Sequence, residues 1–136
     1  MKVSAATEND LEWIKSRDHH LAENLIASKI REREILLLRV ESEAIAGWMR
    51  FGYFWDNTPF MNMIWIEEQY RGTGLGKHIV EFWENEMKQQ GFSMVMTSTQ
   101  ADEGAQHFYR KLGYKDAGSL LLDSQPLEII FTKKLR

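Results

Sequence analysis

A glycine-rich loop between an expected strand and an expected helix constrains this chain more than any other feature. Gly72, Gly74 and Gly76 alternate within the segment 69–77, after the apolar run 60–66 and before a strongly amphipathic stretch. Glycine has no Cβ, so such a loop can turn sharply and bring its amides close to a ligand. The helix start adds unpaired N–H groups and the positive end of the helix dipole. The pattern suits a phosphate or pyrophosphate, and its alternative is a flexible turn before a helix.

Two familiar phosphate loops are excluded by counting residues. A Walker A loop requires glycine, four residues and then Gly-Lys-Ser/Thr, but Arg71 occupies the first glycine position and His78 the hydroxyl position. A dinucleotide-binding GxGxxG loop requires a third glycine where this chain has Lys77. The remaining pattern is Arg-Gly-x-Gly-x-Gly after a strand.

This pattern resembles the acetyl-CoA loop of the GNAT N-acetyltransferase superfamily. In that superfamily the sequence Q/R-x-x-G-x-G/A binds the CoA pyrophosphate through backbone amides, and Arg71, Gly74 and Gly76 match it position by position. The loop departs from the family in one respect, because Ile66-Glu67-Glu68 replaces a common V-x-P before it. The resemblance implies that acetyl-CoA is bound by Trp65, Ile66, Arg71, Gly72, Thr73, Gly74, Leu75, Gly76 and Lys77.

A second segment, 102–114, resembles the GNAT pattern N-x-x-A-x-x-F-Y-x-K-x-G-F/Y. Its apolar residues are spaced to form one helical face, and Gly113 suits a left-handed C-terminal cap. The resemblance implies that Tyr109 is the general acid near the CoA sulfur, with a half-buried structural aromatic as the alternative. Asp102 stands where the family often has an asparagine that contacts CoA, and a carboxylate there can accept a hydrogen bond but not donate one.

The alternation of expected strands and helices predicts one α/β domain covering residues 1–136. Strand, helix, strand, helix in the middle of the chain implies a crossover with parallel neighbours, whereas the flanking strands are linked as hairpins. We therefore expect a GNAT-like mixed, mostly antiparallel sheet with a central parallel strand pair and flanking helices. The expected strands are 3–5, 34–40, 43–55, 60–66, 92–99, 114–122 and 127–133. The first expected helix ends at Lys15, and three more are expected over about 20–29, 74–90 and 105–112.

Composition excludes several classes of protein. The formal charge is −3 without a basic block, which argues against nucleic-acid binding. There is no cysteine, so disulfides and a cysteine nucleophile are excluded. No apolar run reaches the length of a membrane span and no signal peptide is visible, so we expect a cytoplasmic protein without membrane partners. Dimers are common among similar proteins, but no stripe in this sequence demonstrates a homodimer.

The acceptor side of the site is less well defined by the sequence. Relatives often carry a glutamate on the strand before the loop, where this chain has Asn62, and an amide cannot take a proton. Asp56 lies among aromatic residues, which either line a substrate pocket or belong to the core. The candidate substrate-binding residues are Trp55, Asp56 and Asn62. The other carboxylates considered as the base are Glu67, Glu68 and Glu128, and none is named catalytic.

The four histidines do not indicate a metal site. His19 and His20 are adjacent, so on a helix they would point about 100° apart. No HExxH motif or cluster of histidines and carboxylates supports a metal, and His78 and His107 lie on the polar sides of their expected helices. We interpret all four as solvated side chains.

The sequence therefore predicts an acetyl-CoA-dependent N-acetyltransferase acting on a primary amine of a small molecule or peptide by direct attack in a ternary complex. Modification of a protein N-terminus or lysine is an alternative within enzymes. A non-catalytic acyl-CoA-binding sensor or scaffold and an α/β domain for another phosphate ligand are alternatives from other classes.

Overall fold

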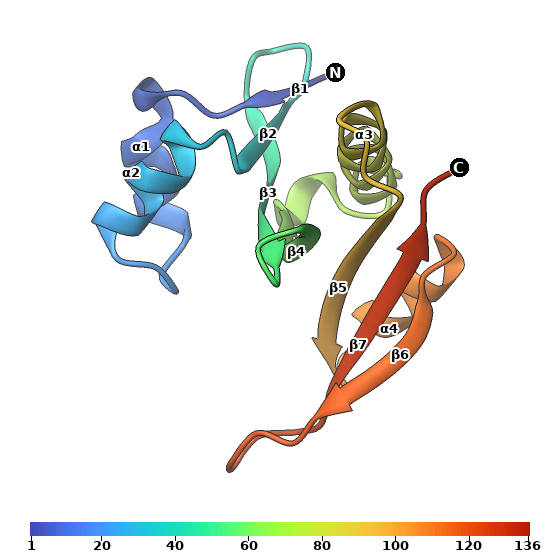
Figure 1. Ribbon diagram of the computed structural model, residues 1–136. Coiled ribbons are helices and arrows are strands. Elements are labelled where there is room, and N and C mark those ends of the chain that lie inside the picture. Colours follow the sequence, from blue (N-terminus) through green and yellow to red (C-terminus); the bar gives the residue numbers. More distant parts are fainter. The chain divides into compact units, whose positions relative to one another are not determined.

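The computed structural model describes the whole chain, Met1–Arg136, which divides into two compact units (Figure 1). Unit 1 comprises Met1–Phe51 and Met63–Ile79, and unit 2 comprises Gly52–Asn62 and Val80–Arg136. Strands β3 (Ile45–Phe54) and β4 (Thr58–Ile66) and helix α3 (Leu75–Gln89) each contribute residues to both units.

The strands follow the mixed topology expected from the sequence. Hydrogen bonds join them in the order β1-β2-β3-β4-β5-β7-β6. Strand β4 pairs with β5 in parallel, whereas β1–β2, β2–β3, β5–β7 and β6–β7 are antiparallel. This confirms a mostly antiparallel sheet with a central parallel pair. The strands are β1 (Lys2–Ala5), β2 (Ile35–Arg39), β3 (Ile45–Phe54), β4 (Thr58–Ile66), β5 (Met94–Gln100), β6 (Lys115–Leu120) and β7 (Glu128–Lys134).

Unit 1 places two helices beside its strands. A 3₁₀ turn, η1 (Glu8–Asp10), leads into α1 (Leu11–Arg17), and α2 (Glu23–Arg31) follows. The Asp10 carboxylate accepts a hydrogen bond from the Thr7 backbone N–H at 2.8 Å, which is part of a capping box at the start of the helical segment. The apolar core of this unit contains Ala6, Ile14, Ile26, Ile30, Ile35, Leu37 and Trp48.

Helix α2 begins three residues later than the sequence predicted. The Asp18 carboxylate accepts a hydrogen bond from the backbone N–H of His20 at 3.1 Å, and Ala22 is extended, with ψ 154°. A side chain that binds a nearby backbone N–H competes with helix formation, so the chain forms a turn here. His19 and His20 therefore lie in the connection between α1 and α2 rather than on a helix.

The turn between β3 and β4 also differs from the expected one. Trp55 and Asp56 both have positive φ, 56° and 61°, and the Asn57 N–H donates to the Phe54 carbonyl at 3.2 Å. These are the features of a two-residue type I′ hairpin turn, whose twist matches that of the flanking strands. Trp55 thus belongs to the turn and Thr58 to strand β4, which corrects the predicted strand end at 55 and strand start at 60.

Unit 2 contains α4 (Ala105–Lys111) and the greater part of α3 (Leu75–Gln89). Gly91 and Gly113 have φ of 96° and 95°, so both helices end at glycines in the left-handed conformation, as the sequence predicted for Gly113. Trp83, Val95 and Phe131 are fully buried and form part of the core. Strand β6 ends at Leu120, two residues earlier than expected, and Leu121 and Leu122 are exposed beyond it.

Candidate active site

The glycine loop has the backbone shape that its sequence required. Gly72 and Gly74 adopt φ of 78° and 86°, where a residue with a side chain is strained. A Cβ at either position would meet no heavy atom within 4 Å, so the space that it would occupy is open. Gly76 lies inside the first turn of α3. The glycines therefore leave an open backbone surface at the start of a long helix.

The amides of this loop have no partners within the protein. The first helical hydrogen bond of α3 runs from the His78 N–H to the Gly74 carbonyl, at 3.1 Å. No group of the chain accepts a hydrogen bond from the backbone N–H groups of residues 72–77. The first turn of α3 contains no acidic side chain that would repel an anion. Unpaired amides and the positive end of a helix dipole are the elements of a diphosphate site, so the loop fits the CoA pyrophosphate.

Side chains hold the loop against the end of β4. The Arg71 guanidinium lies 4.5 Å from the centroid of the Trp65 ring, and its Nε donates to the Ile66 carbonyl oxygen at 2.8 Å. The Thr73 hydroxyl donates to the Tyr70 carbonyl at 2.7 Å, and a 3₁₀ turn, η2 (Glu68–Tyr70), precedes it. These contacts fix the entry to the loop without the proline common in the family.

A glycine on β3 lets the end of β4 approach closely. A Cβ on Gly47 would lie 2.7 Å from the Trp65 carbonyl oxygen and 2.6 Å from Cδ1 of Ile66, distances that require the neighbouring backbone to move. The Glu67 N–H donates to the Ala46 carbonyl at 2.8 Å just beyond this point. The residues Trp65 and Ile66, which the resemblance assigned to acetyl-CoA binding, are therefore placed by local packing with β3.

Tyr109, the predicted general acid, is buried in unit 2 with 5% of its surface exposed. Its ring contacts those of Phe108, Tyr114 and Phe131, with centroids 5.5, 5.8 and 5.9 Å away. Burial raises the pKa of the Tyr109 phenol, and the carboxylates of Glu103 and Glu128 act in the same direction, whereas a hydrogen bond with Thr97 opposes them. The phenol is thus held in its protonated form, the form that a proton donor requires.

The other predicted residues of unit 2 are exposed. Asp102 lies in the turn before α4 and makes no hydrogen bond or ion pair. Trp55 is 80% exposed at the hairpin turn beside Asp56, and Asn62 is exposed on β4. Their contacts with the coenzyme and with the acceptor stay predictions.

Two of the carboxylates considered as the base already have partners. The Glu67 carboxylate accepts a hydrogen bond from Nε of Arg17 at 2.8 Å, and that of Glu128 accepts one from the Ser98 hydroxyl at 2.7 Å. Glu68 is exposed, as is Asp56.

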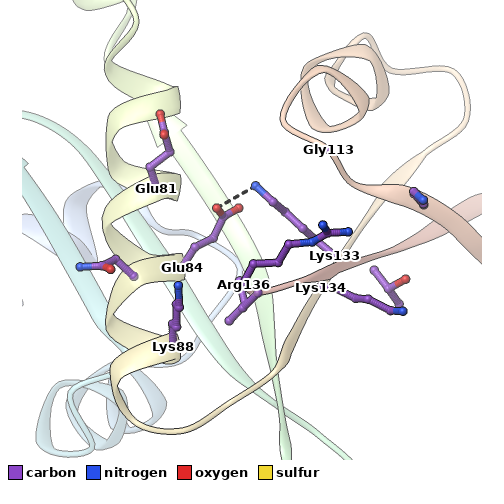
Figure 2. Close-up of a pocket in the computed structure, with 11 residues that line it drawn as sticks. Glu81, Glu84, Lys88, Gly113, Lys133, Lys134 and Arg136 are labelled. Atoms are coloured by element: carbon purple, nitrogen blue, oxygen red, sulfur yellow. Dashed lines mark hydrogen bonds and ion pairs between the residues drawn. The ribbon is translucent and has the colours of Figure 1, made fainter.

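A pocket of about 650 Å³ lies in unit 2, between α3, Gly113 and the end of β7 (Figure 2). Figure 2 shows the Glu84 carboxylate of α3 facing Lys133 of β7, whose Nζ lies 2.9 Å away. The Tyr114 hydroxyl donates to the other oxygen of Glu84 at 2.7 Å. None of the residues predicted for acetyl transfer lines this pocket. We therefore do not assign the active site to it, although it is the larger of the two pockets described.

A smaller pocket, of about 260 Å³, lies in unit 1 beside the end of β4. It includes Trp48 and Trp65, whose ring centroids are 6.2 Å apart, and both histidines of the connection between α1 and α2. Sequence reasoning missed this group of side chains, because Trp48 and the two histidines carry no motif and come together only through the fold.

Comparison with known proteins identifies the class of protein that this fold and loop define. The model of the acetyltransferase (GNAT) family matches residues 4–114, and the chain belongs to that family. A Bacillus subtilis protein, itself only provisionally assigned as an acetyltransferase (BSU40680), is 38% identical over 79 residues, covering 57% of this chain and 52% of that protein. The chain thus matches about half the length of this relative.

Solved structures share the fold at low identity. The ribosomal-protein-S18-alanine N-acetyltransferase of Escherichia coli is 21% identical with a TM-score of 0.78, covering 98% of this chain and 93% of that chain. The NatB acetyltransferase complex bound to CoA contains a chain that is 14% identical with a TM-score of 0.83, and the match covers 100% of both chains. At these identities the likeness establishes the fold alone.

The structure adds two observations on ligands and membranes. Nowhere do three or more His, Cys, Asp or Glu side chains gather in a group that could hold a metal ion. None of the helices combines the length and the apolar character needed to cross a bilayer.

Proposed function

We propose that this protein is an N-acetyltransferase that transfers the acetyl group of acetyl-CoA to a primary amine of a small molecule or peptide, by direct attack in a ternary complex. The unpaired amides of residues 72–77 carry the proposal, because they lie at the start of α3 in a chain of the GNAT family. An open backbone surface with six N–H donors has no structural use in the protein itself, but suits a diphosphate.

Residues on the loop and on the strand before it would bind the coenzyme. The amides of residues 72–77 would hold the diphosphate, with the Lys77 side chain adding positive charge. The backbone N–H groups of Trp65 and Ile66 would donate to the acetyl oxygen, where negative charge develops in the transition state. Asp102 would accept a hydrogen bond from an amide of the coenzyme.

Tyr109 would supply the proton for the departing sulfur. A thiol has an ordinary pKa near 8.5 and a phenol near 10, and burial raises the pKa of Tyr109 further. A neutral phenol is therefore present throughout the physiological range and can donate to a developing thiolate. Trp55, Asp56 and Asn62 remain the proposed contacts of the acceptor in unit 2.

Calorimetry with CoA and a thiol-release assay with acetyl-CoA and a panel of primary amines test this function. We expect CoA to bind and at least one amine to stimulate thiol release above hydrolysis. Binding of CoA without turnover of any amine would instead indicate a sensor or scaffold. Absence of CoA binding would overturn the proposed function as a whole.

A further inference from the structure

The pocket between α3, Gly113 and the end of β7 concentrates positive charge on an acidic chain. Its lining carries five cationic side chains and two carboxylates, a formal charge of +3, whereas the whole chain carries −3. All of these residues belong to unit 2. A hollow lined mainly by one sign of charge focuses the electrostatic potential and attracts ions of the opposite sign. The cations are Lys88, Lys115, Lys133, Lys134 and Arg136, and the carboxylates are Glu81 and Glu84.

Glu84 and Lys133 neutralise each other within this lining. The Lys133 ammonium donates to one oxygen of the Glu84 carboxylate at 2.9 Å, and the Tyr114 hydroxyl donates to the other at 2.7 Å. Glu84 is 8% exposed, so its charge is both paired and largely buried. The pair therefore leaves the charge of the pocket to its other side chains.

The remaining four cations have no counter-ion within the protein. Lys88, Lys115, Lys134 and Arg136 are exposed and make no ion pair or side-chain hydrogen bond. Figure 2 shows Lys88 on α3, whereas Lys134 and Arg136 lie at and beyond the end of β7. Glu81 is the one unpaired carboxylate of the lining, and it is exposed on α3. Separate elements thus bring unpaired positive charges to a single pocket.

Backbone hydrogen bonds fix the places from which these side chains extend. Lys115 of β6 pairs with Thr132 of β7, and Lys134 pairs with Met94 of β5. The Leu135 N–H, next to Arg136, donates to the Ser93 carbonyl at 2.8 Å. Only the side chains therefore have to reorganise around a ligand. The Thr132 hydroxyl and the Asn85 amide, which also line the pocket, can add neutral donors.

The size and the lining of the pocket indicate the class of ligand. Its volume of about 650 Å³ lies within the range of about 300–1,000 Å³ for small-molecule sites, so a single phosphate ion would contact only part of the lining. Lysine ammonium groups bind phosphates as point charges. No aromatic side chain lines the pocket, and Leu135 is its one large apolar residue. The pocket therefore offers no surface on which a nucleobase can stack.

We propose that this pocket binds a small polyphosphate without a nucleobase, whose phosphates are held by Lys88, Lys115, Lys134 and Arg136. The site is distinct from the glycine loop, since none of residues 72–77 lines it. Binding here involves no covalent step and does not depend on acetyl transfer.

Calorimetry with inorganic tripolyphosphate tests this site. The Gly74→Asp variant removes competition from the glycine loop, because its carboxylate enters the open space where we place the CoA diphosphate. We expect this variant to bind tripolyphosphate at least about tenfold more tightly than orthophosphate, since several charges act together. The affinity should fall as sodium chloride is added, because salt screens exposed charges. The unsubstituted protein saturated with CoA gives a second measurement of the same site.

Two further probes test the class of ligand. ATP carries a triphosphate attached to a nucleoside, and it should bind no more tightly than tripolyphosphate because the pocket has no stacking surface. Hexaglutamate, a flexible acidic peptide, should bind more weakly, since it loses more conformational freedom on entering a pocket of this size.

A pair of substitutions then assigns the charges. We expect Lys88→Gln combined with Lys134→Gln, in the Gly74→Asp protein, to weaken tripolyphosphate binding at least about tenfold. The matched control combines Lys2→Gln with Lys111→Gln, which removes the same charge from exposed lysines that make no ion pair and do not line the pocket. The control should keep its affinity for tripolyphosphate. With Gly74 intact, neither pair of substitutions should change the affinity for CoA.

Three outcomes overturn this assignment. They are no binding of tripolyphosphate by either the Gly74→Asp variant or the CoA-saturated protein, an equal loss of affinity in the two pairs of variants, and binding of ATP more tightly than, or of hexaglutamate as tightly as, tripolyphosphate. The last result would instead indicate a nucleotide site or a surface for acidic peptides. Failure of the unsubstituted protein to bind CoA would remove the proposed function but not this site, because the Gly74→Asp variant measures the pocket without CoA.

Discussion

The guanidinium of Arg71 lies 4.5 Å from the centre of the Trp65 ring. The same side chain donates to the carbonyl oxygen of Ile66 at 2.8 Å. The arginine that the sequence motif associates with coenzyme binding is therefore held by the strand before the loop. A planar guanidinium can stack on an aromatic ring and donate from its edge at once, whereas a lysine ammonium cannot do both. Arg71 thus fixes the end of β4 relative to the amides of the loop.

We expect Arg71→Lys to weaken CoA binding about tenfold, because the loop is no longer held in its binding conformation. Calorimetry with CoA measures the affinity. Arg31→Lys is a suitable control, since Arg31 is exposed on α2 and makes no ion pair. Equal affinity of Arg71→Lys and the unsubstituted protein would show that the stacking does not organise the loop.

Gly74→Ala tests the backbone conformation of the loop. At φ of 86° an alanine costs about 1–2 kcal/mol, and its Cβ enters the open space where we place the diphosphate. We expect the free energy of unfolding to fall by roughly that amount and the affinity for CoA to fall more than tenfold, with Gly74→Asp abolishing binding.

Gly104→Ala provides the control for stability in that experiment. Gly104 has φ of −70° and also has open space around it, so an alanine there is not strained. Chemical denaturation of both variants measures the difference. A CoA affinity of Gly74→Ala equal to that of the unsubstituted protein would contradict phosphate binding at this loop.

The features that the sequence predicted correctly depend on residues close together in the chain. The glycine loop, the amphipathic helix after it and the helix stop at Gly113 follow from local spacing and from conformations that glycine favours. The late start of α2 was not predicted, because the hydrogen bond from the His20 N–H to Asp18 competes with helix formation without a strong signal in the sequence.

Features that depend on distant residues were also missed. The partners of Glu84 are Tyr114 and Lys133, which are 30 and 49 residues away in the chain. The contact between the Trp48 and Trp65 rings likewise depends on how β3 and β4 pack. Neither arrangement follows from a local pattern, since each requires the strand register to be known.

Tyr109→Phe tests the general acid. We expect kcat to fall by roughly a hundredfold, because the departing thiolate loses its proton donor, while the affinity for CoA stays the same. Since burial raises the pKa of the Tyr109 phenol, its deprotonation should cause no loss of kcat below about pH 10. Tyr114→Phe is the control, because it removes a hydroxyl from the same aromatic cluster. It should lower the free energy of unfolding without lowering kcat. Unchanged turnover by Tyr109→Phe would remove Tyr109 from the mechanism.

Ionisation of Tyr114 makes the stability of unit 2 fall at alkaline pH. Burial raises the pKa of its phenol, and the negative charge of Glu84 and the hydrogen bond to it raise it further. The folded state therefore holds the phenolic proton more tightly than the unfolded state, whose tyrosine has a pKa near 10. The stabilising contribution is fully present below about pH 10 and is lost as the pH rises above that value.

We expect Tyr114→Phe to lower the free energy of unfolding at pH 7 by about 1.5–3 kcal/mol, because Glu84 loses a hydrogen bond to its charged form. Between pH 10 and pH 11 this difference should shrink by up to about 1.4 kcal/mol, since only the unsubstituted protein then needs to keep Tyr114 protonated. Urea denaturation at pH 7, 10 and 11 measures both values. Tyr70→Phe, which removes a hydroxyl without a hydrogen bond, should show no such change. Because Tyr109 also has a raised pKa, Tyr114→Phe should still lose part of its free energy of unfolding at alkaline pH. If the difference in free energy of unfolding between the two proteins stays constant with pH, Tyr114 is not the group responsible.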